Sequence, residues 1–149
     1  MKRGRIFVML AGMVMATVSP WAFADQFQQF GEYIIHYNAL STDFLPADRA
    51  KHYGITRSRN RGMLTLAVRK QLPDGTETAV AAEVDASAVN LNNQYRDIAL
   101  REFREDQAIY YVGDFPVSHQ ETLRFTVLVK PEDSDSTYSV KFSQRFVTR

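Results

Sequence analysis

Apolar and polar residues alternate with a period of two along most of the chain, as half-buried β-strands do. The segments with this alternation, or with the aromatic and β-branched residues that strands favour, are 30–37, 64–69, 80–86, 95–103, 108–115, 122–130 and 137–147. Short polar connections separate them, and no internal repeat occurs. The pattern predicts an all-β, immunoglobulin-like antiparallel sandwich of about seven strands. A small closed barrel is the main alternative, but up-and-down barrels usually have an even number of strands.

Residues 41–54 break this alternation. Pro46 suits the first position of a helix, Asp48 lies near its positive end, and Gly54 can end it in the left-handed conformation. We therefore predict one short helix near residues 46–53. Further on, the turn at Pro73–Gly75 predicts that segments 64–69 and 80–86 form a hairpin.

The first 24 residues have the pattern of a cleaved signal peptide. Basic residues at positions 2, 3 and 5 precede the uncharged apolar run Ile6–Val18, and small residues follow at Ala22 and Ala24. As a helix this run would extend only about 20 Å, short of the roughly 30 Å core of a bilayer. We expect no membrane span, a periplasmic or fully secreted protein, and one domain over residues 25–149.

Removal of that segment changes the sign of the net charge. Three of the 18 Lys and Arg residues lie in it and none of the 17 Asp and Glu, which leaves 15 against 17, a net charge of −2. A basic surface for nucleic acid is therefore not indicated. The chain has no cysteine, which excludes disulfides, thiolate zinc sites and cysteine nucleophiles.

Little in the sequence indicates catalysis or a cofactor. His36, His52 and His119 are far apart and form no closely spaced pair of metal ligands. Ser118 and His119 are adjacent, so on an extended chain they point to opposite faces. No glycine-rich phosphate loop or G-x-S-x-G motif occurs. We predict a protein that is not an enzyme and has no cofactor, with a small hydrolase or metal-binding protein as a remote alternative.

The stretch YGITRSRNRG, Tyr53–Gly62, carries Arg57, Arg59 and Arg61 at alternate positions. If residues 56–62 are extended, the three guanidinium groups lie on one face about 7 Å apart and can grip phosphate, sulfate or carboxylate groups. One interpretation is the binding of an anionic envelope glycan or lipid headgroup. The other, which we favour, is that they pair with the acidic residues near Glu102–Asp106 and hold the segment onto the sandwich.

Three stretches, HYNAL at His36–Leu40, YGITRSRNRG at Tyr53–Gly62 and ETLRF at Glu121–Phe125, together resemble a known family. It is domain-of-unknown-function family 4426, a group of small exported proteobacterial proteins. The resemblance implies a compact β-rich envelope domain and no activity. The residues that match its pattern and could bind a ligand are His36, Asn38, Arg57, Arg59 and Arg61.

These observations predict a non-enzymatic binding or protein-interaction module of the cell envelope, present as a monomer or weak dimer. Its partner is expected to be an envelope protein or an anionic envelope ligand. Exposed sheet edges would accept a strand of such a protein through main-chain hydrogen bonds.

Overall fold

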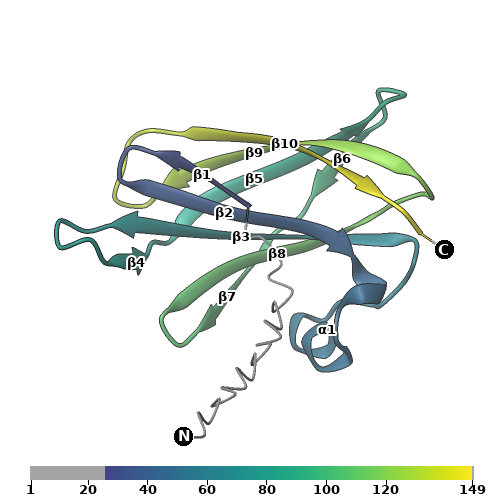
Figure 1. Cartoon of the computed structure of the whole chain (residues 1–149), viewed down its shortest axis with the longest axis horizontal. Coiled ribbons are helices and arrows are strands. Elements are labelled where there is room, and N and C mark those ends of the chain that lie inside the picture. Colours follow the sequence, from purple (N-terminus) through teal and green to yellow (C-terminus); the bar gives the residue numbers. More distant parts are fainter. Residues whose placement is uncertain (1–25, 149) are drawn as a thin grey trace, which may run out of the picture.

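The computed structural model describes residues 26–148, which form two antiparallel sheets (Figure 1). The six-stranded sheet runs in the order β1 (Gln26–Phe30), β2 (Tyr33–Ser41), β3 (Arg61–Gln71), β8 (Ala108–Pro116) and β7 (Arg101–Glu105), with β4 (Glu77–Ala79) added to β3. The four-stranded sheet runs β10 (Tyr138–Phe146), β9 (Glu121–Pro131), β5 (Ala82–Asn90) and β6 (Tyr95–Ile98). The predicted all-β antiparallel sandwich is confirmed, but the count of seven strands is wrong because the described residues form ten.

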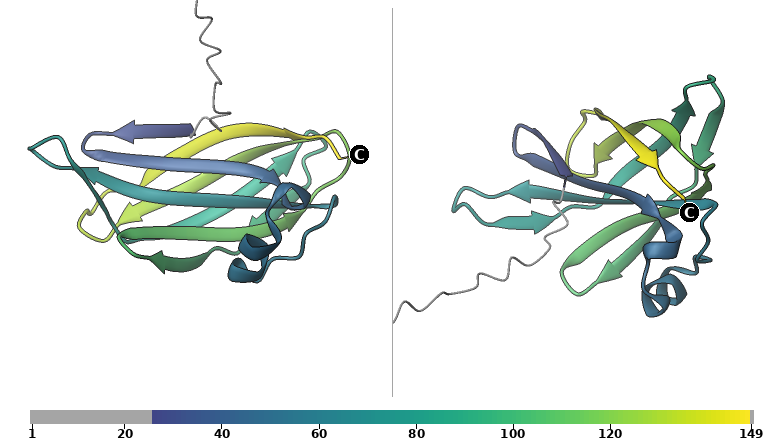
Figure 2. Two further views of the ribbon diagram at one scale, coloured as in Figure 1. Left: turned by 60° about the horizontal axis from the view of Figure 1, so that its bottom comes forward. Right: turned by 45° about the vertical axis from the view of Figure 1, so that its right-hand side comes forward.

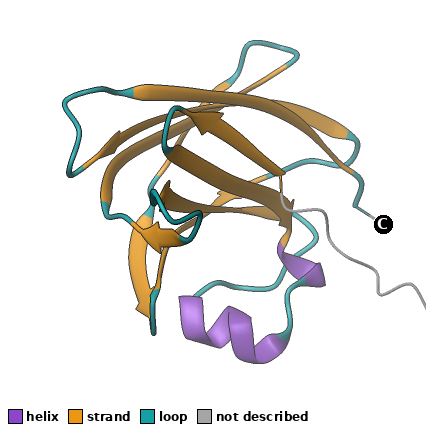
Figure 3. Cartoon of the chain, turned by 60° about the vertical axis from the view of Figure 1, so that its left-hand side comes forward, coloured by secondary structure: helices purple, strands orange, loops and turns teal. Residues whose placement is uncertain are grey.

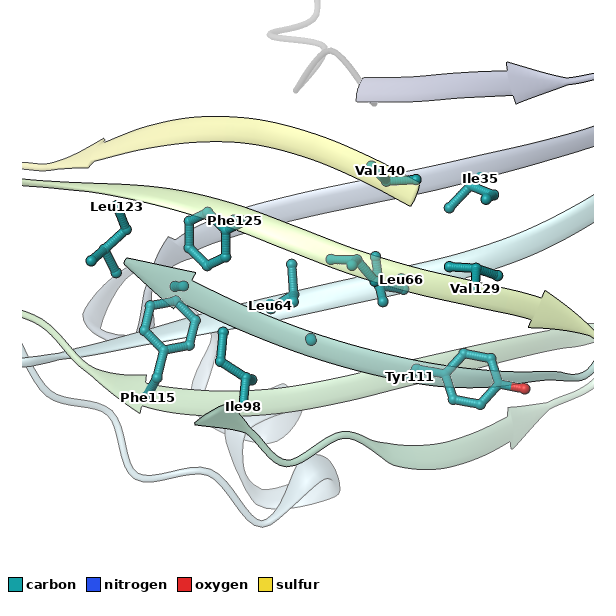
Figure 4. Packing of buried hydrophobic residues seen from close by; sticks show 14 of the residues in the cluster. Ile35, Leu64, Leu66, Ile98, Tyr111, Phe115, Leu123, Phe125, Val129 and Val140 are labelled. Atoms are coloured by element: carbon teal, nitrogen blue, oxygen red, sulfur yellow. The ribbon is translucent and has the colours of Figure 1, made fainter. Parts of the chain in front are cut away.

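The two sheets pack face to face (Figure 2) around one apolar core, whose side chains Figure 4 shows between them. Phe125 lies at its centre, stacked on Phe142 with ring centroids 4.7 Å apart and edge-on to Phe115 at 5.5 Å. Gly62 allows this packing, since a Cβ atom there would lie 2.5 Å from the Phe115 ring. The alternation read from the sequence is therefore the alternation between this core and the two outer faces.

The predicted first strand, 30–37, is instead the junction of a hairpin. Gly31 adopts a left-handed φ of 58° and turns the chain between β1 and β2. Aromatic or β-branched residues occur on both sides of this turn, so their enrichment alone does not reveal it.

The predicted hairpin of 64–69 with 80–86 is wrong. The turn at Pro73–Gly75 joins β3 to the three-residue β4, and β5 then pairs with β9 and β6 in the other sheet. The N–H of Val80 still donates to the carbonyl of Val68, whereas the N–H of Ala82 donates to the Tyr111 hydroxyl. The chain thus leaves the six-stranded sheet between these two residues.

Segment 95–103 is also not one strand. It divides into β6, in the four-stranded sheet, and β7, in the six-stranded sheet. Ala99 and Leu100 carry the chain from one sheet to the other, with the carbonyl of Ala99 packed against Gly113.

The predicted helix is confirmed as α1 (Ala47–Tyr53), which follows the short 3₁₀ turn η1 (Thr42–Phe44). Gly54 ends it with a left-handed φ of 64°. Figure 3 shows these helical segments on one side of the sandwich. Tyr53 and Ala50 of α1 pack with Met63 and Val112, which lie on the outer face of the six-stranded sheet. One end of that face is therefore covered and the rest is open.

Within residues 26–148, no helix has the length and apolar character needed to cross a membrane. The predicted signal peptide, residues 1–24, lies outside the described residues.

Candidate functional site

Arg57, Arg59 and Arg61 do not form the row expected of an extended segment. Arg59 and Asn60 form a turn, and β3 begins only at Arg61, so the predicted extension over 56–62 is wrong. The cause is the fully buried Thr42. Its hydroxyl accepts a hydrogen bond from the N–H of Ser58 at 2.9 Å and lies 3.0 Å from two main-chain carbonyls, those of Thr56 and Ser58.

Arg57 and Arg61 bind groups of the protein itself. Arg57 donates to the main-chain carbonyl of Asp43 at 3.1 Å, and Arg61 Nε donates to Asp114 Oδ2 at 2.6 Å. Arg59 lies exposed in the turn. These contacts agree with the interpretation that the segment is held onto the sandwich, although the acid is Asp114 and not one near Glu102–Asp106. Binding of an external anion by these arginines stays a prediction.

The acidic strip near Glu102–Asp106 has other partners. Glu105 lies 3.5 Å from Arg49 and 2.7 Å from His52, both on α1, and Glu102 pairs with Arg104 at 2.7 Å. Glu105 thus helps to hold α1 against β7.

His36 and Asn38 lie in a different place, a groove of about 360 Å³ on the open part of the outer face of the six-stranded sheet. It begins where the cover of α1 ends, since Met63 is buried beneath the helix while the next outward residue of β3, Thr65, lines the groove. The outward-facing residues that line it are His36 and Asn38 from β2, Thr65, Ala67 and Arg69 from β3, Glu77 and Ala79 from β4, and Ala108 and Tyr110 from β8.

The groove combines polar walls with an apolar floor. His36 and Asn38 supply an imidazole and an amide along one side. Small side chains such as Ala67 form the floor of the groove. Arg69 Nε lies 3.0 Å from Glu77 Oε2, so the charged end is internally neutralised. Phe27, 56% exposed, extends the apolar surface beside the His36 ring, with centroids 5.8 Å apart. This lining suits a neutral ligand that exchanges hydrogen bonds.

The six-stranded sheet splits beside the groove, where β4 and the start of β8 separate (Figure 1). β8 pairs with β3 only from Tyr111 onward, whereas β4 pairs with β3 at residues 69–71. In the described part of the chain, Ala108–Tyr110 have no partner strand on the side that faces β3, and β4 has β3 as its one neighbour. Both segments line the groove, so two strand edges with unpaired main chain face each other across it.

Tyr111 supports this split from the core side. Its hydroxyl accepts the N–H of Ala82 at 2.8 Å, and burial raises the pKa of Tyr111. Sequence reasoning did not find Thr65, Tyr110 or the Arg69–Glu77 pair as site residues. In the sequence these residues are marked only by a position that faces away from the core. Every outward-facing residue of a strand has such a position, so it does not single them out.

The three histidines do not come together. His36 lies on β2, His52 on α1, and His119 in the β8–β9 turn, where its Nδ1 is 3.4 Å from Thr148 Oγ1. Residues 26–148 contain no group of three His, Cys, Asp or Glu side chains placed to hold a metal ion. The convergence that a histidine metal or hydrolase site requires is therefore not formed.

The family model for a domain of unknown function, DUF4426, matches residues 27–148. The chain belongs to the DUF4426 family. A crystal structure of a DUF4426 family protein from Pseudomonas aeruginosa is 29% identical with a TM-score of 0.72, covering 84% of this chain and 96% of that one. The resemblance seen in the sequence is confirmed.

The DUF4426 domain also shares its fold with more distant proteins. FetP of uropathogenic Escherichia coli strain F11, expressed in the periplasm of E. coli, is 9% identical with a TM-score of 0.59, covering 84% of this chain and 95% of that one. A copper-bound variant of FetP is also 9% identical, with a TM-score of 0.55 and coverage of 85% and 92%. At this identity the likeness shows the fold alone. A comparison with curated proteins finds no match.

Proposed function

We propose that this DUF4426 domain is an exported, non-enzymatic interaction module of the cell envelope that binds an extended segment of a partner protein. The observation that carries the proposal is the split in the six-stranded sheet. The edges of β4 and of residues 108–110 in β8 face each other across the groove that holds His36 and Asn38.

A strand added at such an edge gains main-chain hydrogen bonds, and pockets for its alternate side chains provide selectivity. The N–H of Val80 points toward β3, where it donates to Val68. Because successive N–H groups of a strand point to opposite sides, the N–H of Ala79 points away from β3, toward the groove. The polar lining and small floor residues would then contact the side chains of the added strand.

Three further observations support a non-enzymatic, exported protein. The imidazole of His36 has the ring of Phe27 beside it, and no nucleophilic side chain is hydrogen-bonded to that imidazole in the described residues. The basic and apolar segment ahead of Asp25 is of the kind that directs export. FetP, which shares the fold, has been expressed in the periplasm.

The first experiment locates the partner. A photo-crosslinking amino acid is placed at Ala67, on the floor of the groove, and in a second variant at Ser87, on the outer face of the four-stranded sheet. We expect irradiation of cells to crosslink an envelope protein from position 67 and not from position 87. The crosslinked peptide, identified by mass spectrometry, is then synthesised for binding measurements.

The second experiment tests the mode of binding. Ala79→Pro removes the N–H that points into the groove and spares the ladder between β3 and β4, whereas Ala79→Gly keeps that N–H. Losing one main-chain hydrogen bond of about 1.4 kcal/mol should weaken the peptide about tenfold in the proline variant, while the glycine variant binds like wild type. Equal binding by all three proteins, or turnover of a substrate in the groove, would contradict the proposal.

A further inference from the structure

The outer face of the four-stranded sheet separates its charges by strand. Its basic side chains lie on β9 and β10, and its acidic side chains lie on β5 and β6. The basic residues are Arg124, Lys130, Lys141 and Arg145, and the acidic residues are Glu83, Asp85 and Asp97. No acidic side chain of β9 or β10 faces outward, because Glu121 points inward, where it is only 9% exposed.

Three of these cations have no partner. Lys130 lies directly across from Glu83, but the side chains of Arg124, Lys141 and Arg145 make no hydrogen bond or ion pair with any residue between 26 and 148. Elsewhere the guanidinium groups are occupied by carboxylates or carbonyls, as in Arg49, Arg57, Arg61, Arg69, Arg96, Arg101 and Arg104. The three are therefore available to an external anion.

The register of β9 and β10 places hydroxyl groups between these cations. Arg124 lies opposite Ser143, and Lys141 lies opposite Thr126. Cross-strand partners are about 5 Å apart and diagonal neighbours about 7 Å apart, so the guanidinium of Arg124 and the ammonium of Lys141 flank the same two hydroxyls. These four residues line one shallow depression. A phosphate group seated there would meet charged donors and hydroxyl donors together.

Exposed apolar side chains border the same surface. Leu91, 70% exposed, follows the end of β5, and Val147, 54% exposed, follows the end of β10, so both project from the end of the sandwich that carries Arg145. Tyr95, 63% exposed, lies across from Val89, whose other neighbour is Arg124. Proteins that rest on membranes combine cations for the headgroups with apolar side chains that enter the interface.

We propose that this surface, the β9–β10 cationic face formed by Arg124, Lys141 and Arg145 with Leu91 and Val147, docks the protein on the anionic headgroups of a phospholipid bilayer. The apolar border favours a bilayer over a soluble ion, because apolar side chains enter a membrane interface and gain nothing from a free phosphate. The residues after position 24 carry a net negative charge, so an anionic bilayer repels the molecule as a whole and attracts only its cationic face. This face would therefore turn toward the membrane. The groove on the opposite sheet stays accessible, and docking does not depend on what that groove binds.

The test measures binding to lipid vesicles of the protein purified from the envelope of expressing cells after export. Vesicles that mix phosphatidylglycerol with phosphatidylcholine are compared with phosphatidylcholine alone. We expect sedimentation with the anionic vesicles only, weakened by salt. Arg124→Gln/Lys141→Gln/Arg145→Gln should weaken binding about 100-fold, since each cation near an anionic surface contributes about fivefold. The control Arg49→Gln/Lys51→Gln/Arg104→Gln removes the same charge from α1 and β7, away from this face, and should stay within about twofold of wild type.

A second variant separates lipid from soluble anion. Leu91→Ser/Val147→Ser keeps every charge and should still weaken binding to anionic vesicles. If this variant binds like wild type and inorganic phosphate competes fully, the face takes a soluble anion and the proposal is overturned. Unchanged binding by the triple glutamine variant overturns it as well. Should that variant fail to fold, Lys141→Gln alone repeats the test with an expected loss of about fivefold.

Discussion

The outer face of the six-stranded sheet is partly covered by α1 and its arginines are paired, whereas the outer face of the four-stranded sheet has no such cover within residues 26–148, where three of its cations also lack a partner. Arg61 and Arg124 both lie on outer faces of strands. Arg61 is diagonal to Asp114, which neutralises it, while Arg124 has Ser143 and Val89 as its cross-strand neighbours. A cation is therefore structural when a residue on the neighbouring strand pairs with it, and available when none does. The density of arginines along the chain does not decide this.

The largest difference expected between the two faces is in stability. Met63 is buried beneath α1 and is 4% exposed, whereas Leu128 on the other face is 41% exposed. Met63→Ala should lower the free energy of unfolding by about 3 kcal/mol, because it leaves a cavity under the helix, and Leu128→Ala by less than about 1 kcal/mol. Urea denaturation measures both. Equal losses would mean that α1 does not cover this face in solution.

The second largest difference is expected between a buried and an exposed carboxylate of the four-stranded sheet, in their contributions to the free energy of unfolding. Glu121 accepts hydrogen bonds from Arg96 at 2.6 Å, from Asn90 at 3.0 Å and from the N–H of Ser118 at 2.8 Å. Burial opposes its ionisation, but these donors outweigh burial and hold the pKa of Glu121 below its ordinary value. Since the pKa is lower in the folded state, the carboxylate contributes stability above its unfolded pKa and loses it as pH falls through the folded pKa.

Glu121→Gln should therefore unfold about 2 kcal/mol more easily at pH 7, because Arg96 loses its carboxylate. The difference from wild type should shrink on acidification below about pH 4. Urea denaturation across that pH range tests both statements. Glu83→Gln, at an exposed position on the same sheet, is the control and should change stability by a few tenths of a kcal/mol. A constant difference at every pH would argue against an ionised Glu121.

The smallest effect concerns the arginines around the turn at 59–60. Arg57→Gln/Arg59→Gln/Arg61→Gln should destabilise the protein by about 1 kcal/mol, chiefly through the partly exposed pair of Arg61 with Asp114, whereas Arg124→Gln should leave stability unchanged. Thermal unfolding compares them. If the triple variant keeps full stability and loses binding of an anionic glycan or lipid headgroup, these arginines serve a ligand and the comparison between the two faces is reversed.

Several elements were predictable because they depend on neighbours in the chain. Pro46 and Gly54 bound α1 through their own backbone preferences, and the alternation of Leu123 through Val129 follows from the pleat of a strand. The resemblance to the family pointed to His36 and Asn38, although it could not show that they line a groove on one face of β2.

The sequence by itself therefore determined the fold class, the helix and its ends through local spacing, and it gave the family and the candidate residues of β2 through the resemblance of its motifs. Only the tertiary structure decided which sheet each strand joins, as in the division of 95–103, and which cations have partners. Strand partners are chosen by contacts between residues distant in sequence, and a buried hydroxyl such as Thr42 can bend a segment that local propensity would leave extended. The binding surfaces proposed for this protein arise from those long-range contacts, because they bring β4 to face β8 and leave Arg124, Lys141 and Arg145 without acidic partners among residues 26–148.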